Sequence, residues 1–275
     1  MLCTSCGVLV GVNDETCYNC GRRNPALWGW APALRELGAD LGFVPFVIGT
    51  CVLVYILSLI SSSGIVGMSG LSLLAPDTRA LILFGASGAY PVFVLDRWWT
   101  VLSAGWLHAG ILHIFMNMLV FRQLAPSVAD MYGAGRTVIV YIAGSLGGFA
   151  LSSFAGAFLP ALPFLRGAPL TVGASASIAA LIGAILAYGH RSGSTTARRY
   201  ASTYVLMLVI YGFIFPGIDN YAHLGGFGSG YLAARLLDPL KPERVDHIVI
   251  ALVCLGLSLV SIVVSVLQVV VMVSG

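Results

Sequence analysis

The chain has 275 residues, of which 58% are hydrophobic and only 9% charged, and its mean hydropathy is +0.94. This composition excludes a soluble domain of this size, because such a domain cannot bury so much apolar surface. A formal net charge of +3, scattered along the chain, does not favour nucleic acid as a partner. We therefore expect an all-α, multi-pass protein of a lipid bilayer.

The chain begins with a polar, cysteine-rich segment, residues 1–24. Its cysteines follow the spacing C-x2-C-x10-C-x2-C and are Cys3, Cys6, Cys17 and Cys20. Four thiolates at this spacing suit tetrahedral Zn²⁺, and the segment resembles a zinc ribbon, in which the metal is structural. Two disulfides are the alternative, which a reducing cytosol disfavours. We expect this module to bind a cytoplasmic protein partner or to regulate, since it leaves no open metal position for catalysis.

Seven apolar stretches follow a short linker, residues 25–40. No basic and apolar signal sequence precedes the first stretch, so we expect that stretch to remain as a spanning helix. Each stretch is close to the roughly 20 residues that cross a bilayer. The predicted spans are residues 41–60, 102–121, 137–159, 171–189, 200–217, 219–237 and 247–273.

The positions of the basic residues predict the orientation in a plasma or inner membrane. With the N-terminus in the cytoplasm and the C-terminus outside, eleven of the fourteen Lys and Arg residues lie on the inner side, as the positive-inside rule requires. The inner set is Arg22, Arg23, Arg35, Arg122, Arg136, Arg191, Arg198, Arg199, Arg235, Lys241 and Arg244. The remaining three, Arg79, Arg97 and Arg166, fall outside.

Two polar residues stand out in the fourth and sixth predicted spans. Ser175 and His223 each lie four or five residues into a span that runs inward, so both are about 7 Å below the outer surface at ~1.5 Å per residue. Buried hydroxyl and imidazole groups are costly in hydrocarbon and usually have a function there. A nucleophile and a base at one depth predict a hydrolase that works inside the membrane.

Small residues predict that these two spans approach closely. The sixth span carries a stripe of small residues at four-residue spacing, and the fourth span offers a second set. The stripe is Ala222, Gly226, Gly230 and Ala234, and the second set is Gly173, Ala176, Ala179, Ala180 and Gly183. Such contact would bring the imidazole within hydrogen-bond reach of the serine hydroxyl.

The second predicted span supplies further hydrogen-bond donors. His113 and Asn117 are four residues apart and share a helix face, from which both could donate to the oxyanion of an acyl-transfer intermediate. His108 lies about 140° further round the same helix and is expected to have another role.

Together these motifs resemble the rhomboid family of intramembrane serine proteases over residues 43–238. The resemblance rests on His108, His113 and Asn117, on Gly173-x-Ser175, and on Asn220-x-Ala222-His223 followed by Gly226 and Gly230. It implies a six-helix catalytic core, residues 41–238, followed by a cytoplasmic loop and an extra seventh span, residues 239–275. One departure is the family's Trp-Arg pair in the first loop, where Trp99 is followed by Thr100 and the nearest guanidinium is Arg97.

The resemblance also implies a role for each site residue. Ser175 would be the nucleophile and His223 its general base, without a carboxylate. His113, Asn117 and the backbone N–H of Ser175 would form the oxyanion hole, while His108 would be structural or control hydration. The substrates would be membrane proteins, cut in a transmembrane segment near its outer end.

Two other serines are alternatives to Ser175 as the nucleophile, and two other functions are alternatives to a protease. Ser87 lies in Gly85-Ala86-Ser87-Gly88, a better match to the common serine motif, but Gly-Ser clusters are typical of surface turns. Ser177 is about 200° round the helix from Ser175 and cannot share its face. The alternative functions are a catalytically inactive relative that binds and escorts membrane proteins, and a transporter whose histidines relay protons.

Overall fold

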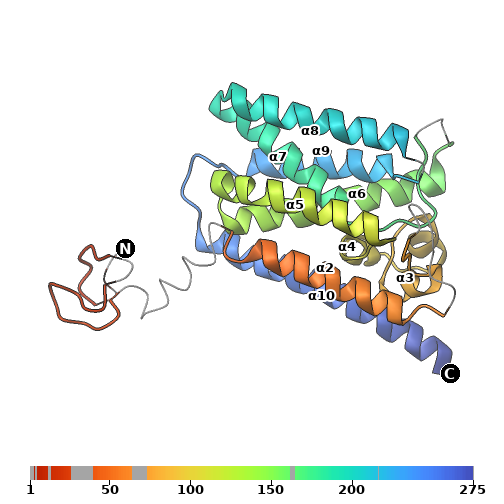
Figure 1. Ribbon diagram of the computed structural model, residues 1–275, viewed down its shortest axis with the longest axis horizontal. Coiled ribbons are helices and arrows are strands. Elements are labelled where there is room, and N and C mark those ends of the chain that lie inside the picture. The colour runs from red at the N-terminus through yellow and green to blue at the C-terminus, as the bar shows by residue number, and fades with distance from the viewer. Residues whose placement is uncertain are drawn as a thin grey trace.

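The computed structural model describes residues 3, 5–11, 14–25, 40–63, 73–161, 165–215 and 217–274, and the predicted linker, residues 25–40, lies almost entirely outside them. The described chain is helical, as predicted (Figure 1). The long helices are α2 (Phe43–Ile60), α5 (Ile111–Tyr132), α6 (Ala134–Phe158), α7 (Ser175–Ser192), α8 (Thr195–Ile214), α9 (Asn220–Leu236) and α10 (Val245–Ser274). The segment between α2 and α5 adds α3 (Thr78–Phe84), α4 (Thr100–Ser103) and two short turns, η3 (Tyr90–Val94) and η4 (Ala104–Trp106).

The seven long helices correspond to the seven apolar stretches. By length and hydropathy, α2, α5, α6 and α10 qualify as membrane spans among the described residues. Helices α7 and α9 are less apolar, but most of α7 and one face of α9 are buried in the bundle, where neighbouring helices replace lipid. In Figure 1, α8 runs along one edge of the bundle, and α2 and α10 run along the opposite edge.

The second predicted span, 102–121, is wrong by about nine residues at its start, because α5 begins only at Ile111. The apolar run from Val101 to Leu107 instead forms α4 and η4, and Trp106 and Leu107 are fully buried there. Hydropathy cannot distinguish a loop that is buried in protein from a helix that faces lipid. Arg122, predicted in an inner loop, consequently lies within α5.

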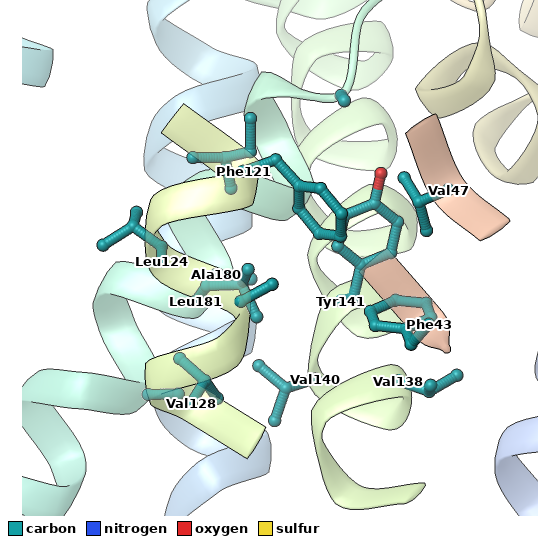
Figure 2. Close-up of a cluster of buried hydrophobic side chains, with 14 of the residues drawn as sticks. Phe43, Val47, Phe121, Leu124, Val128, Val138, Val140, Tyr141, Ala180 and Leu181 are labelled. Carbon is teal, nitrogen blue, oxygen red and sulfur yellow. The ribbon is translucent and has the colours of Figure 1, made fainter. Parts of the chain in front are cut away.

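The apolar core lies where α2, α5, α6 and α7 meet (Figure 2). Three aromatic rings from three helices pack edge to face at its centre: Phe43 lies 5.7 Å from Phe121 and 5.4 Å from Tyr141, and the latter two are 5.3 Å apart. Aliphatic side chains of α5, α6 and α7 surround these rings. This contact fixes α2 and α5 against α6.

Helices α6, α7 and α9 approach one another through small residues. A Cβ on Gly144 of α6 would overlap Ala180 of α7, and a Cβ on Gly225 of α9 would lie 2.5 Å from the carbonyl oxygen of Gly147 on α6. Only glycine permits such close backbone contact, which is the usual basis of helix association in membranes. The three helices therefore form the most tightly packed part of the bundle.

The last helix, α10, is tied to the rest of the chain at both ends. At one end the buried guanidinium of Arg97 donates to the carbonyl oxygen of Ser265 at 2.9 Å, and the indole N–H of Trp99 donates to the Ser265 hydroxyl at 3.1 Å. At the other end, Arg136 donates to His247 Nδ1 and to the carbonyl oxygens of residues 241 and 242. The loop between α2 and α5 is thus anchored on the seventh long helix.

Candidate active site

Ser175 is the first residue of α7, and the chain reaches it through an extended segment held on both sides. Thr171 pairs with Ser87 through two backbone hydrogen bonds of 2.8 and 3.1 Å, and the N–H of Gly173 donates to the carbonyl oxygen of Ala104 at 2.9 Å. Gly173 has φ +132°, a conformation that side chains with a Cβ rarely adopt. The prediction that Ser175 lies four or five residues inside its helix was therefore wrong.

The close approach of α7 and α9 predicted from their small residues is confirmed. A Cβ on Gly226 would overlap the carbonyl of Ala176, and a Cβ on Gly230 would overlap the backbone of Ala180. Further along α7, a Cβ on Gly183 would lie 2.9 Å from the backbone nitrogen of Tyr231. These contacts advance together along both chains, so the helices run in the same direction, with the first turn of α7 beside the turn of α9 that follows His223.

His223 is the fourth residue of α9 and faces the bundle interior, with 8% of its surface exposed. Its Nδ1 atom is buried without a hydrogen-bond partner among the described residues. The hydroxyl of Ser175 is half-buried and likewise makes no hydrogen bond within the described chain. A nucleophile and its base are often not yet bonded in a structure without substrate, so the geometry is compatible with a Ser-His pair.

His113 faces the residues just before Ser175. Its Nδ1 accepts the backbone N–H of Ala109 at 3.3 Å, so in the neutral ring the proton sits on Nε2. A Cβ on Gly173 would lie 2.8 Å from this Nε2 atom. This nitrogen therefore lies beside the turn that precedes the candidate nucleophile.

Asn117 lies one helical turn beyond His113 and is buried, with 7% exposed. One amide hydrogen is used within α5, where Nδ2 donates to the carbonyl oxygen of His113 at 2.8 Å. An amide carries a second hydrogen on the same nitrogen, which leaves one donor for a bound group.

His108 lies in the loop before α5, so its predicted position on the same helix as His113 is wrong. The two rings nevertheless touch edge to face, with centroids 5.2 Å apart. His108 is 1% exposed, and its contact supports the ring of His113 from behind. Asn220 opens α9 and donates from Nδ2 to the carbonyl oxygen of Gly212 at 3.0 Å, which ties α9 to α8.

The Rhomboid domain matches residues 95–239, more than half of the chain. The chain belongs to the rhomboid family. It is 31% identical to RHOMBOID-like protein 4 of Arabidopsis thaliana over 169 residues, which are 60% of this chain and 40% of that protein. It is 33% identical to RHOMBOID-like protein 1 of the same plant over 165 residues, 58% of this chain and 40% of that protein.

A bacterial relative, the Rhomboid protease GluP of Bacillus subtilis (strain 168), is 29% identical over 164 residues, 58% of this chain and 30% of that protein. This rhomboid therefore spans well under two thirds of the length of these relatives. Family membership supports a function of the intramembrane-protease type, and with the four candidate spans it makes the chain an integral, multi-pass membrane protein.

Ser87 does not lie in a surface turn, and that prediction is wrong. The side chain is completely buried, and its hydroxyl lies 3.4 Å from both Ser153 Oγ and Thr100 Oγ1. Its backbone forms the bridge to Thr171 described above. In this rhomboid the rival serine braces the segment that leads to Ser175. Ser177, the other rival, is buried within α7.

Asp219, which immediately precedes α9, belongs to none of the predicted motifs. Its carboxylate accepts the backbone N–H of Ala222 at 3.0 Å, so Asp219 is the N-cap of the helix that carries His223. An aspartate just before a predicted helix is a recognisable N-cap signal, and it could have been found from the sequence.

The four N-terminal cysteines form a separate cluster. Their sulfur atoms lie within 4.8 Å of one another, with Cys3 and Cys20 3.8 Å apart and Cys6 and Cys17 3.6 Å apart. A tetrahedron with Zn–S bonds of about 2.3 Å has sulfurs ~3.8 Å apart, whereas a disulfide needs ~2.05 Å. The residues present therefore fit a four-thiolate metal site.

Backbone amides further favour the thiolate form of two of these cysteines. The N–H of Val8 and the side chain of Asn19 lower the pKa of Cys6 to about 6, and the N–H groups of Cys6 and Ser5 lower the pKa of Cys3. Gly7 and Gly21, at φ +71° and +69°, make the turns that follow each cysteine pair. Thiolates are the form in which cysteine binds metal.

Proposed function

We propose that this rhomboid is an intramembrane serine protease that cleaves transmembrane segments of membrane proteins near their outer end. One observation carries the proposal: the backbones of α7 and α9 touch in parallel, with Ser175 on the first turn of α7 and His223 one turn before Gly226 on α9, so both lie at the same end of this contact. Both side chains lack hydrogen bonds at the reacting atoms described above, which leaves them available to each other and to a substrate.

In the proposed reaction, Ser175 Oγ attacks the carbonyl carbon of the scissile peptide while His223 accepts the hydroxyl proton. The resulting oxyanion is stabilised by His113 Nε2–H and by Asn117. The backbone N–H of Ser175 is a third donor, because the first residues of a helix have no intrahelical acceptor for their N–H groups. His223 then returns the proton to the leaving amine, and a water molecule hydrolyses the acyl-enzyme.

The charge distribution supports an orientation with the N-terminus in the cytoplasm and the C-terminus outside. Arg191, Arg198 and Arg235 lie at the ends of α7, α8 and α9 that are remote from Ser175 and His223. In this orientation the first turns of α7 and α9 lie near the outer surface, where water can reach the acyl-enzyme. The core would comprise residues 41–238, and residues 239–275 would add the cytoplasmic loop and the extra span.

The N-terminal module, residues 1–24, is proposed to bind one structural Zn²⁺ through Cys3, Cys6, Cys17 and Cys20. With four protein thiolates the metal has no open position for water, so its contribution is to fold this small module. The module would present its surface to a cytoplasmic protein partner.

Labelling with a fluorophosphonate, followed by mass-spectrometric mapping of the modified residue, tests the proposal. We expect modification of Ser175 in the purified, detergent-solubilised chain, and no modification of the Ser175→Ala variant. His223→Ala should slow labelling strongly, while Ser87→Ala and Ser177→Ala should be labelled like the wild type. Modification at Ser87 would refute the assignment. The absence of labelling, with no cleavage of a transmembrane reporter, would instead favour a binding or transport function.

A further inference from the structure

Asp219 holds the first turn of α9 by two kinds of contact. Its carboxylate Oδ1 accepts the N–H of Ala222 at 3.0 Å, and its backbone carbonyl oxygen accepts the N–H of His223 at 3.2 Å. The imidazole of the candidate base is therefore attached to a helical turn that this residue caps. Helix ends fray when their N–H groups lack such partners.

The other carboxylate oxygen of Asp219 reaches a different helix. Oδ2 accepts the hydroxyl of Ser152 on α6 at 2.5 Å, and the same hydroxyl oxygen accepts the N–H of Ala168 at 3.3 Å. Ala168 belongs to the segment that leads to Ser175, and its carbonyl oxygen accepts the N–H of Ala89 at 3.0 Å. Asp219 and Ser152 thus connect the turn that carries His223 to the segment that leads to Ser175.

This connection is independent of the glycine contacts between α7 and α9. The glycine contacts, at Gly226 and beyond, set the distance between the helix axes. They lie on the C-terminal side of His223, whereas the first turn is held by its cap and by the close approach of α6, where a Cβ on Gly148 would lie 2.6 Å from the carbonyl oxygen of Ala222. An error of about 1 Å in the position of a catalytic group is enough to cost roughly 10²-fold in rate.

We propose that Asp219 is a positioning residue, which holds His223 at the correct distance and angle from Ser175 by bonding Ala222 and Ser152 at the same time. The inference rests on the proposed protease function. It assigns Asp219 a geometric role through its two hydrogen bonds, without a direct charge interaction with the imidazole. An asparagine could preserve both bonds, because its amide oxygen can accept the N–H of Ala222 and its amide nitrogen can donate to Ser152 Oγ.

The test compares Asp219→Ala, Asp219→Asn and a matched control, Ser194→Ala, in the full-length chain. Ser194 caps α8 by the same kind of bond, to the N–H of Ala197 at 3.2 Å, but α8 carries neither Ser175 nor His223. We expect Asp219→Ala to lower kcat about 10- to 100-fold with KM within threefold, and to slow fluorophosphonate labelling of Ser175 similarly. Asp219→Asn should keep at least about a third of wild-type kcat, and Ser194→Ala at least about half.

Several outcomes would overturn this role. Wild-type kcat and labelling rate in Asp219→Ala would do so, as would a rise in KM alone, or equal losses in Asp219→Asn and Asp219→Ala. If Asp219→Ala does not accumulate as folded protein, Ser152→Ala removes one of the two bonds and should lower kcat about 3- to 10-fold; unchanged kcat there would also overturn the role. If the wild type is not labelled at Ser175 at all, the proposed function itself fails.

Discussion

Two segments of this rhomboid carry nearly the same four residues, 85–88 with Ser87 and 173–176 with Ser175, yet the structure surrounds their serines differently. Ser87 is completely buried, and its hydroxyl lies near those of Ser153 and Thr100. Ser175 opens a helix, is half-buried and makes no hydrogen bond within the described chain. These different surroundings show that the Gly-Ala-Ser motif alone does not define a nucleophile. A reactive serine needs an unoccupied hydroxyl beside a base, whereas a bonded one stabilises the fold.

The largest expected effect comes from removing the reacting groups. We expect Ser175→Ala and His223→Ala each to lower cleavage of a transmembrane reporter by roughly 10⁴-fold or more, with the double variant hardly worse than either single one, because the pair acts as a unit. Ser87→Ala and Ser177→Ala should retain activity, although Ser87→Ala should lower the thermal unfolding temperature. Loss of activity in Ser87→Ala, with activity kept in Ser175→Ala, would show that Ser87 and not Ser175 is the nucleophile.

The next effect comes from separating the helices that carry Ser175 and His223. In Gly226→Ala the new Cβ would overlap the carbonyl of Ala176, so α7 and α9 must move apart, and we expect turnover to fall by more than about 10²-fold. Gly228→Ala is the matched control, because a Cβ there meets nothing within 4 Å. Reporter cleavage by both folded variants measures the difference. Equal activities would show that the close contact does not position the pair.

A smaller effect is expected at the oxyanion donors. His113→Ala and Asn117→Ala should each lower turnover by about 10²-fold or less, since one such donor contributes ~3 kcal/mol and the remaining donors compensate in part. Fluorophosphonate labelling of Ser175 should persist, because its hydroxyl and base are intact. If His113→Ala abolished labelling as completely as Ser175→Ala, His113 would be the better candidate for the base.

The smallest effect on activity is expected from deleting the N-terminal module, which contains neither Ser87 nor Ser175. Deleting residues 1–24 should remove about one zinc per chain, measured by elemental analysis, and leave reporter cleavage in detergent within about twofold. Any larger effect should appear only in cells, through a lost partner or lower abundance. A purified truncation that is folded but inactive would show that the cysteine cluster is coupled to catalysis.

Much of this fold could be predicted from the sequence, because lipid imposes a simple rule on spanning helices. Seven apolar stretches gave seven helices, and the small residues at Gly226 and Gly230 correctly indicated the contact with α7. The boundaries that failed lie where apolar residues are buried by protein. Trp106 and Leu107 lie in a stretch that is as apolar as a spanning helix, but they belong to the segment before α5, where neighbouring protein buries them.

The environment of the candidate site was harder to predict, because it depends on contacts between distant segments. Nothing local to Ser87 shows that its backbone pairs with Thr171, and that pairing is why Ser175 begins its helix instead of lying inside it. His108 could not be placed for a similar reason, since its contact with His113 is made from a loop. Asp219, in contrast, is predictable from local sequence, because an aspartate just before a helix is a typical N-cap.

The anchoring of Arg97 and Trp99 on Ser265 has a consequence for how this protein is made. One acceptor of the Arg97 guanidinium follows it by 168 residues and belongs to α10, which is synthesised after the other described helices. Arg97 also donates to the carbonyl oxygen of Ile82 at 2.8 Å, but until α10 inserts, its second terminal nitrogen lacks the Ser265 acceptor, and an unpaired polar group is costly in an apolar environment. We therefore expect the loop that braces the segment before Ser175 to reach its final conformation only after α10 has inserted.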